Sequence, residues 1–255
     1  MDSIVTKTNG SNLGSGARAN GGADHRLHIE DGRVSLVTLD EVKRYREVQT
    51  LLRRADEYLG VIGYTEHGLR HANLTASIAQ NILLYLHHGE RQAQLAAIAG
   101  YLHDIGNVVN RNVHGEVGGV LALQLLLGMG MGIDEAAMVA AAVGNHEEDN
   151  GEPVSDIAAA VIIADKSDVH RSRVRNPNPL EFDIHDRVNY AAVHSFVRVD
   201  EARKAIALEL TIDEGSGAGV MDYFEIFLQR MLAARRSAKK LGCQFELVIN
   251  KNRML

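Results

Sequence analysis

The residues that first suggest chemistry are a histidine and an aspartate, side by side at the end of an apolar segment. His103 and Asp104 follow the run Leu95-Ala-Ala-Ile-Ala-Gly-Tyr-Leu102 and precede Ile105-Gly106. Neighbouring residues on a helix point about 100° apart, so both side chains can lean into one cavity. A buried aspartate without a partner is costly, and a metal ion or an arginine would neutralise it. A core histidine bonded to the aspartate is the alternative that this pair alone leaves open.

Further residues of the same two types stand on or beside other helical segments. They are His71, His114, His146 and Asp165, the last directly after the apolar run 157–164. One converging metal site accounts for such a set more economically than separate burials would. Imidazole with a few carboxylates suits Mn, Fe, Zn, Co or Ni better than Mg. We therefore expect a bound divalent transition metal.

Apolar periodicity predicts that helices carry these residues. Asp40 is expected to cap a helix that runs to Leu59, and Ser155 or Asp156 to cap one that ends near Asp165. The other expected helices span residues 67–88, 90–105, 112–127, 134–144 and 183–193. Strands at 195–199 and 204–212, a helix at 220–241 and a strand at 244–249 then predict a ββαβ unit with a small, mostly antiparallel sheet.

These elements divide the chain into three parts. Residues 1–32 are rich in Gly, Asn and Ser without an apolar period, which predicts a disordered tail. Residues 33–194 are expected to form a helical metal-binding domain, and residues 195–255 the ββαβ subdomain. The fold class expected is mainly α, with a small α+β unit at the C-terminus.

Composition excludes several classes of protein. The formal net charge of −6 gives no global basic field for nucleic acid or an anionic membrane. A single cysteine, Cys243, excludes a disulfide scaffold and a cysteine zinc cluster, and favours a reducing compartment. No apolar run approaches the roughly 20 residues of a transmembrane helix, and the N-terminus lacks the pattern of a signal peptide. We expect a cytoplasmic protein.

The order of the histidines and aspartates resembles the HD superfamily of metal-dependent phosphohydrolases over about residues 64–175. The matching motifs are His71-Ala-Asn-Leu-Thr-Ala-Ser-Ile-Ala, His103-Asp104-Ile-Gly, His114-Gly-Glu-Val-Gly-Gly, Asn145-His146-Glu147 and Ala164-Asp165-Lys166-Ser-Asp168. Many relatives carry a lysine after the HDIG motif that touches substrate phosphate, whereas this chain has Asn107, a neutral donor.

The resemblance implies a metal held by four residues and a hydrolytic reaction. His71, His103, Asp104 and Asp165 would bind one ion, and in dinuclear relatives Asp104 would bridge to a second ion held by His114 and His146. His103 and Asp104 are thus the expected catalytic residues. The implied reaction is hydrolysis of a phosphate ester or anhydride of a nucleotide or small phosphorylated metabolite, with metal-bound hydroxide as the nucleophile.

Basic residues near these motifs are expected to bind the substrate's phosphate. Arg111 lies between two of the histidine motifs, and the others follow Asp165: Lys166, Arg171, Arg173 and Arg175. Arginine forks match phosphate geometry, which favours this interpretation over a solvated basic stretch. The acidic residues after His146 are Glu147, Glu148 and Asp149. A solvated acidic loop is the favoured expectation for them, and the alternative is that one of them positions water or binds outer-shell solvent.

Two other functions remain open from the sequence. A di-iron oxygenase would use a related helical His/Asp site, and a nucleotide-sensing or dimerising regulatory module would bind without turnover. Exposed edges of the small sheet favour a homodimer. We expect a phosphorylated small molecule as partner, and neither a membrane nor a nucleic acid.

Overall fold

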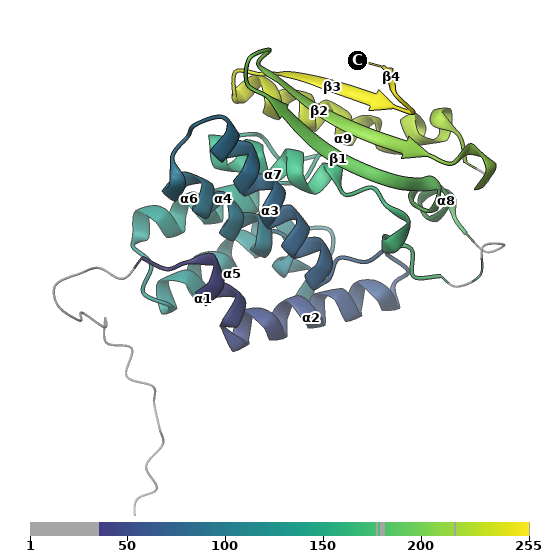
Figure 1. Cartoon of the computed structure of the whole chain (residues 1–255). Coiled ribbons are helices and arrows are strands. Elements are labelled where there is room, and N and C mark those ends of the chain that lie inside the picture. The colour runs from purple at the N-terminus through teal and green to yellow at the C-terminus, as the bar shows by residue number, and fades with distance from the viewer. Residues whose placement is uncertain (1–35, 177, 179–181, 217, 255) are drawn as a thin grey trace, which may run out of the picture.

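The computed structural model describes residues 36–176, 178, 182–216 and 218–254 (Figure 1). The tail expected at residues 1–32 lies outside the described residues. A helical domain fills the lower part of the view in Figure 1, and a small sheet from the C-terminal part of the chain lies above it. The expected fold class, mainly α with a small C-terminal α+β unit, is confirmed.

The first expected helix is two helices, α1 (Leu39–Arg44) and α2 (Arg46–Val61). They meet at Tyr45, whose backbone is extended with φ −69° and ψ 119°. Thr38 caps α1 in place of Asp40, because its side chain accepts from the Glu41 amide while Glu41 accepts from the Thr38 amide. This reciprocal pair is a capping box, which fixes the helix start two residues earlier than expected.

Five longer helices build the body of the helical domain. They are α3 (Leu69–Tyr85), α4 (Glu90–Leu102), α5 (His114–Gly128), α6 (Ile133–Gly144) and α7 (Asp156–Ser167), and the short 3-10 helix η1 (Ile105–Val108) links α4 to α5. The expected cap of α7 is Ser155, whose hydroxyl accepts from the Ala158 amide at 3.1 Å. Every residue of α7 from Ile157 to Ser167 is buried, so this helix forms the centre of the molecule.

The C-terminal unit begins with α8 (Ile184–Ala191), after the 3-10 turn η2 (Arg171–Arg173). Its further elements are β1 (Ala192–Asp200), β2 (Ala205–Ile212), the 3-10 turn η4 (Glu214–Ser216), α9 (Val220–Lys240), β3 (Gln244–Ile249) and β4 (Asn252–Arg253). The sheet order is β1-β2-β3-β4, with β2 and β3 parallel and the other two pairs antiparallel. The expected ββαβ unit is therefore present. The structure adds β4, which at two residues is too short to leave a pattern in the sequence.

One hydrophobic core joins the two parts of the chain. Ile163 of α7 shares an apolar layer with Met231 and Ala234 of α9 and with Phe245 of β3. β1 already begins at Ala192, so the division placed at residue 195 falls inside a strand. In the described part of the sheet, β1 has one edge without a partner strand, and the expected homodimer stays a prediction. Within the same described ranges, none of the helices combines the length and apolarity needed to cross a membrane.

Candidate metal centre

The structure brings all six predicted metal-binding residues together in the interior of the helical domain. His71 comes from the first turn of α3, and Asp165 from the last turn of α7. The remaining four lie where helices end or begin, His103 and Asp104 after α4, His114 at the start of α5 and His146 just after α6. None of the six is more than 8% exposed. The site therefore depends on helix ends meeting around the buried α7.

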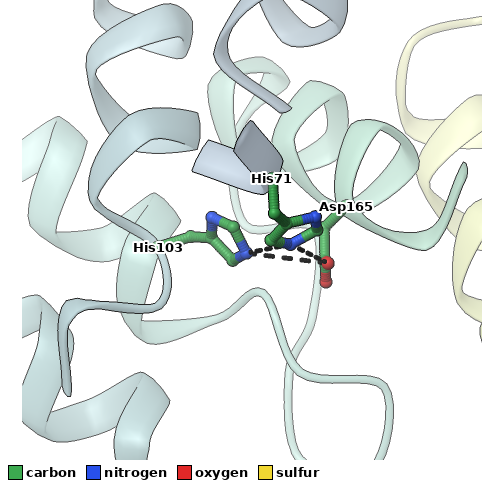
Figure 2. Close-up of side chains that lie close together, drawn as sticks. All are labelled: His71, His103 and Asp165. Atoms are coloured by element: carbon green, nitrogen blue, oxygen red, sulfur yellow. Dashed lines mark hydrogen bonds and ion pairs between the residues drawn. The ribbon is translucent and has the colours of Figure 1, made fainter. Parts of the chain in front are cut away.

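Four of these side chains form the first half of the site. Nε2 of His71 lies 3.0 Å from Nε2 of His103 and 3.2 Å from Oδ1 of Asp165. Figure 2 shows these three side chains pointing toward one another. Oδ2 of Asp104 lies 3.2 Å from Nε2 of His103. Donor atoms that bind one ion at about 2.1 Å lie roughly 3.0–3.4 Å apart, so these separations fit a shared metal ion.

The second half of the site lies on the other oxygen of Asp104. Oδ1 of Asp104 is 3.5 Å from Nε2 of His114, which is 3.1 Å from Nε2 of His146. Glu147 completes this group, because its Oε1 lies 2.8 Å from Nε2 of His114 and 3.4 Å from Nε2 of His146. The expectation that Glu147 belongs to a solvated loop is therefore wrong. The tight turn after α6 directs both His146 and Glu147 inward.

Hydrogen bonds at Nδ1 fix how each of the four imidazoles is oriented. Nδ1 of His71 is 2.7 Å from a carboxylate oxygen of Asp168. The other three rings place Nδ1 at 2.7–2.8 Å from the carbonyl oxygens of Gly100, Arg111 and Val143. Because these oxygens accept the Nδ1 proton, every Nε2 is left to face the site, as metal-binding histidines require.

Electrostatics favour a cation at the centre. Burial disfavours the charged ring of His103, but the carboxylates of Asp104 and Asp165 outweigh it and raise its pKa to about 10. Burial alone would raise the pKa of Asp104, yet the His103 ring holds it well below its usual range. Oδ2 of Asp104 has no hydrogen-bond partner among the described residues although it is buried. A buried, anionic oxygen that accepts no hydrogen bond and faces a histidine nitrogen fits a metal ion bound between the two.

Outside the donor atoms, two residues orient the aspartate and the first histidine. Asn107 donates from Nδ2 to Oδ1 of Asp104 at 2.8 Å, so the residue that replaces the lysine of many relatives holds a carboxylate. Arg70 donates to Asp168 at 2.8 Å, and Asp168 in turn accepts from His71. Such outer contacts set the direction of the binding atoms.

The basic residues that were expected to bind phosphate lie in different surroundings. Arg111 lies at the site, with Nη1 3.1 Å from Nε2 of His114 and 4.0 Å from Oδ1 of Asp104, and its guanidinium covers the ring of Tyr64. Lys166 is buried and pairs with Asp165 at 2.7 Å and with Glu148. Burial disfavours its charge, but these carboxylates outweigh it and raise the pKa of Lys166.

The three arginines after α7 contact other parts of the chain. Arg173 is buried and donates to the carbonyl oxygens of Glu66 and Asp168. Arg171 covers the ring of Tyr190, and Arg175 forms an ion pair with Asp56. The basic stretch therefore braces the fold, because the chain turns away from the donor atoms after Asp168. Among the described residues, Arg111 is the predicted phosphate-binding residue that lies beside the second half of the site, and the role expected for the others stays a prediction.

A cleft of about 410 Å³ lies beside this site, and its lining includes Arg111, which contacts His114. Tyr64, His67, Arg111 and Glu148 line its side on the helical domain, and Asp186, Asn189, Phe227 and Arg230 are among the residues that line its other side. Nδ1 of His67 bonds to the carbonyl oxygen of Thr65, and its ring centre lies 5.5 Å from that of His71. The C-terminal unit thus forms part of the wall of the cleft beside the candidate centre.

Comparisons with known proteins match this part of the chain. Residues 64–170 match the family model of the HD domain. The chain is also 27% identical over 202 residues to the uncharacterized protein MJ1020 of Methanocaldococcus jannaschii, an alignment that covers 70% of this chain and 77% of that protein. The matched segment begins at the cleft residue Tyr64 and includes all seven residues that supply donor atoms.

Proposed function

We propose, from the premise that residues 64–170 are an HD domain of the metal-dependent phosphohydrolase superfamily, that this protein hydrolyses a small phosphate ester or anhydride. The substrate class proposed is a nucleotide or a small phosphorylated metabolite. The observation that carries the proposal is the position of Asp104, whose two oxygens each face a separate group of donor atoms. A carboxylate placed between two groups suits a pair of metal ions.

The donor set assigns two binding positions. His71, His103, Asp104 and Asp165 would hold the first ion. Asp104, His114, His146 and Glu147 would hold the second. Two such ions lower the pKa of a bound water and neutralise charge on a phosphoryl group. Mn, Fe, Zn, Co and Ni suit these nitrogen and oxygen donors.

The chain's own side chains orient the reaction around that centre. Arg111 is placed to bind a phosphate oxygen, since its guanidinium stands at the cleft beside the second group and the Tyr64 ring supports it. Asn107 keeps Oδ1 of Asp104 directed toward His114. The helix ends that surround the site shield it from bulk water, which strengthens every charge interaction inside it.

Metal loading and hydrolysis test the proposal together. Protein reconstituted with Mn²⁺ or Fe²⁺ is expected to retain about two equivalents of metal and to hydrolyse p-nitrophenyl phosphate, its bis ester or a member of a nucleotide panel. Elemental analysis and phosphate or nitrophenol release measure both. Consumption of dioxygen by the iron form without hydrolysis would indicate an oxygenase. Binding of a nucleotide without turnover would indicate a sensing module, and protein that retains no metal would contradict the proposal.

A further inference from the structure

The cleft has chemically different walls. On the helical domain, Arg111 lies beside the donor atoms of the candidate metal centre. On the C-terminal unit, α8 contributes Asp186 and Asn189 to the lining, together with its N-cap residue Asp183. A phosphate drawn to the metal centre and Arg111 would leave the organic part of its ester near the α8 wall. The groups on that wall therefore decide which organic parts fit.

Two carboxylates, those of Asp183 and Asp186, stand on this wall. Neither Asp183 nor Asp186 forms an ion pair with a lysine or arginine of the described residues. Oδ1 of Asp183 accepts from the Asp186 amide at 2.7 Å as the cap of α8. Burial and the Asp183 charge raise the pKa of Asp186, which reflects two carboxylates held close together at the cleft.

Asn189 provides an independent observation at the same wall. Its side chain is buried, with an exposed fraction of 4%, and its Nδ2 donates to the carbonyl oxygen of His185 at 2.9 Å. Its Oδ1 has no hydrogen-bond partner in the part of the chain that the structure describes. A buried amide oxygen without a donor costs stability, so a ligand donor would be favourable there.

We propose that Asp186 and Asn189 bind hydrogen-bond donors on the organic part of the substrate, so that the C-terminal unit selects a phosphate ester bearing hydroxyl or ammonium groups. This inference rests on the proposed function, because it takes the metal centre to hold the phosphate. Carboxylate and amide oxygens are acceptors, and a site built from acceptors discriminates strongly against an analogue that lacks the donor.

Binding of phosphonates tests the selection without requiring hydrolysis, because their carbon–phosphorus bond replaces the ester linkage. Calorimetry on the full-length, Mn²⁺-loaded protein compares 2-aminoethylphosphonate, 2,3-dihydroxypropylphosphonate and propylphosphonate. We expect at least one of the two donor-bearing compounds to bind about tenfold more tightly than propylphosphonate. The preferred compound then identifies an ammonium or a hydroxyl group as the donor.

Variants of the α8 wall decide whether that preference arises there. Asp186→Ala and Asn189→Ala are each expected to reduce it at least threefold, whereas Glu225→Ala, which removes an exposed carboxylate of α9, should keep it. If Asn189→Ala fails to fold, Asp186→Ala alone decides. Equal or undetectable binding of all three phosphonates, or a preference that survives in Asp186→Ala, overturns the inference. A preference that is lost in the variants while the wild type hydrolyses no phosphate ester contradicts the proposed function alone.

Discussion

At the scale of single residues, the site is organised by one carboxylate. Asp104 is 97% buried, and each of its oxygens is within 3.5 Å of a different histidine Nε2. Asn107 donates to Oδ1, whereas Oδ2 has no hydrogen-bond donor within the described residues. Removing this side chain therefore affects both groups of donor atoms, whereas removing Glu147 affects one.

Asp104→Ala is expected to lose both metal ions and to reduce kcat by several orders of magnitude. Glu147→Gln is expected to retain the first ion, held by His71, His103, Asp104 and Asp165, and to bind the second more weakly, with a smaller loss of kcat. Elemental analysis and kcat measured on the same preparations distinguish the two variants, and circular dichroism checks that they fold. Near-normal turnover in a folded Asp104→Ala variant would refute the phosphohydrolase proposal.

The six histidines and aspartates are predictable from the sequence because each ends or begins an apolar segment, where a buried polar group needs a partner. Glu147 carries no such signal, since it precedes Glu148, Asp149 and Asn150 in a polar stretch. Only the turn after α6 directs it inward. For the arginines after Asp165, closeness in sequence does not fix direction: Arg173 donates to the carbonyl oxygen of Asp168, and Arg175 reaches back to α2. Their expected role in phosphate binding stays a prediction.

At the scale of elements, the second group of donor atoms depends on how closely α5 approaches η1. A Cβ on Gly106 of η1 would lie 2.0 Å from the carbonyl oxygen of His114 and 2.6 Å from the amide nitrogen of Gly118. Both contacts are with backbone atoms, which cannot rotate away. The glycine of the HDIG motif is thus required by packing, and it sets the position of His114.

Gly106→Ala is expected to destabilise the protein by about 1–3 kcal/mol, because α5 must move to admit the methyl group. Gly128→Ala is the matched control. Gly128 lies at the C-terminal end of α5, with open space around its Cβ position. Alanine there favours the helix. Urea denaturation gives the free energy of unfolding of both variants. Equal stability of the two would contradict the packing role of Gly106.

Helix positions were predictable where an apolar run and a cap agree, as in α7 with Ser155. The break between α1 and α2 at Tyr45 could not be predicted, because the apolar periodicity continues through this residue. The start of α3 was placed two residues early, since Gly68 is the N-cap and His67 stands before the helix. Pairing in the sheet depends on long-range contacts, and β4 is held by only two residue pairs with β3.

At the scale of the whole molecule, the C-terminal unit is built onto the helical domain. α7 packs on α3 and α4 on one side and on α9 on the other. Arg230 of α9 lies 3.5 Å from Glu148, next to the donor residue Glu147, and Arg236 donates to the Glu148 carbonyl oxygen. The unit therefore covers the buried helix that carries Asp165 and contacts the loop that carries the second group.

This shared core predicts one cooperative unfolding transition for the metal-loaded protein, in place of separate transitions for residues 33–194 and 195–255. Leu247→Ala tests it, because Leu247 is fully buried in β3 and its truncation should cost about 2–5 kcal/mol. Leu228→Ala, on α9 but 49% exposed, is the control and should cost much less. In urea, helix loss followed by circular dichroism and metal release followed by a chelating dye should shift together in Leu247→Ala. Metal release at the wild-type urea concentration would instead mean that the helical domain folds independently. The separation expected near residue 195 would then hold in energetic terms, although the two parts share an apolar layer.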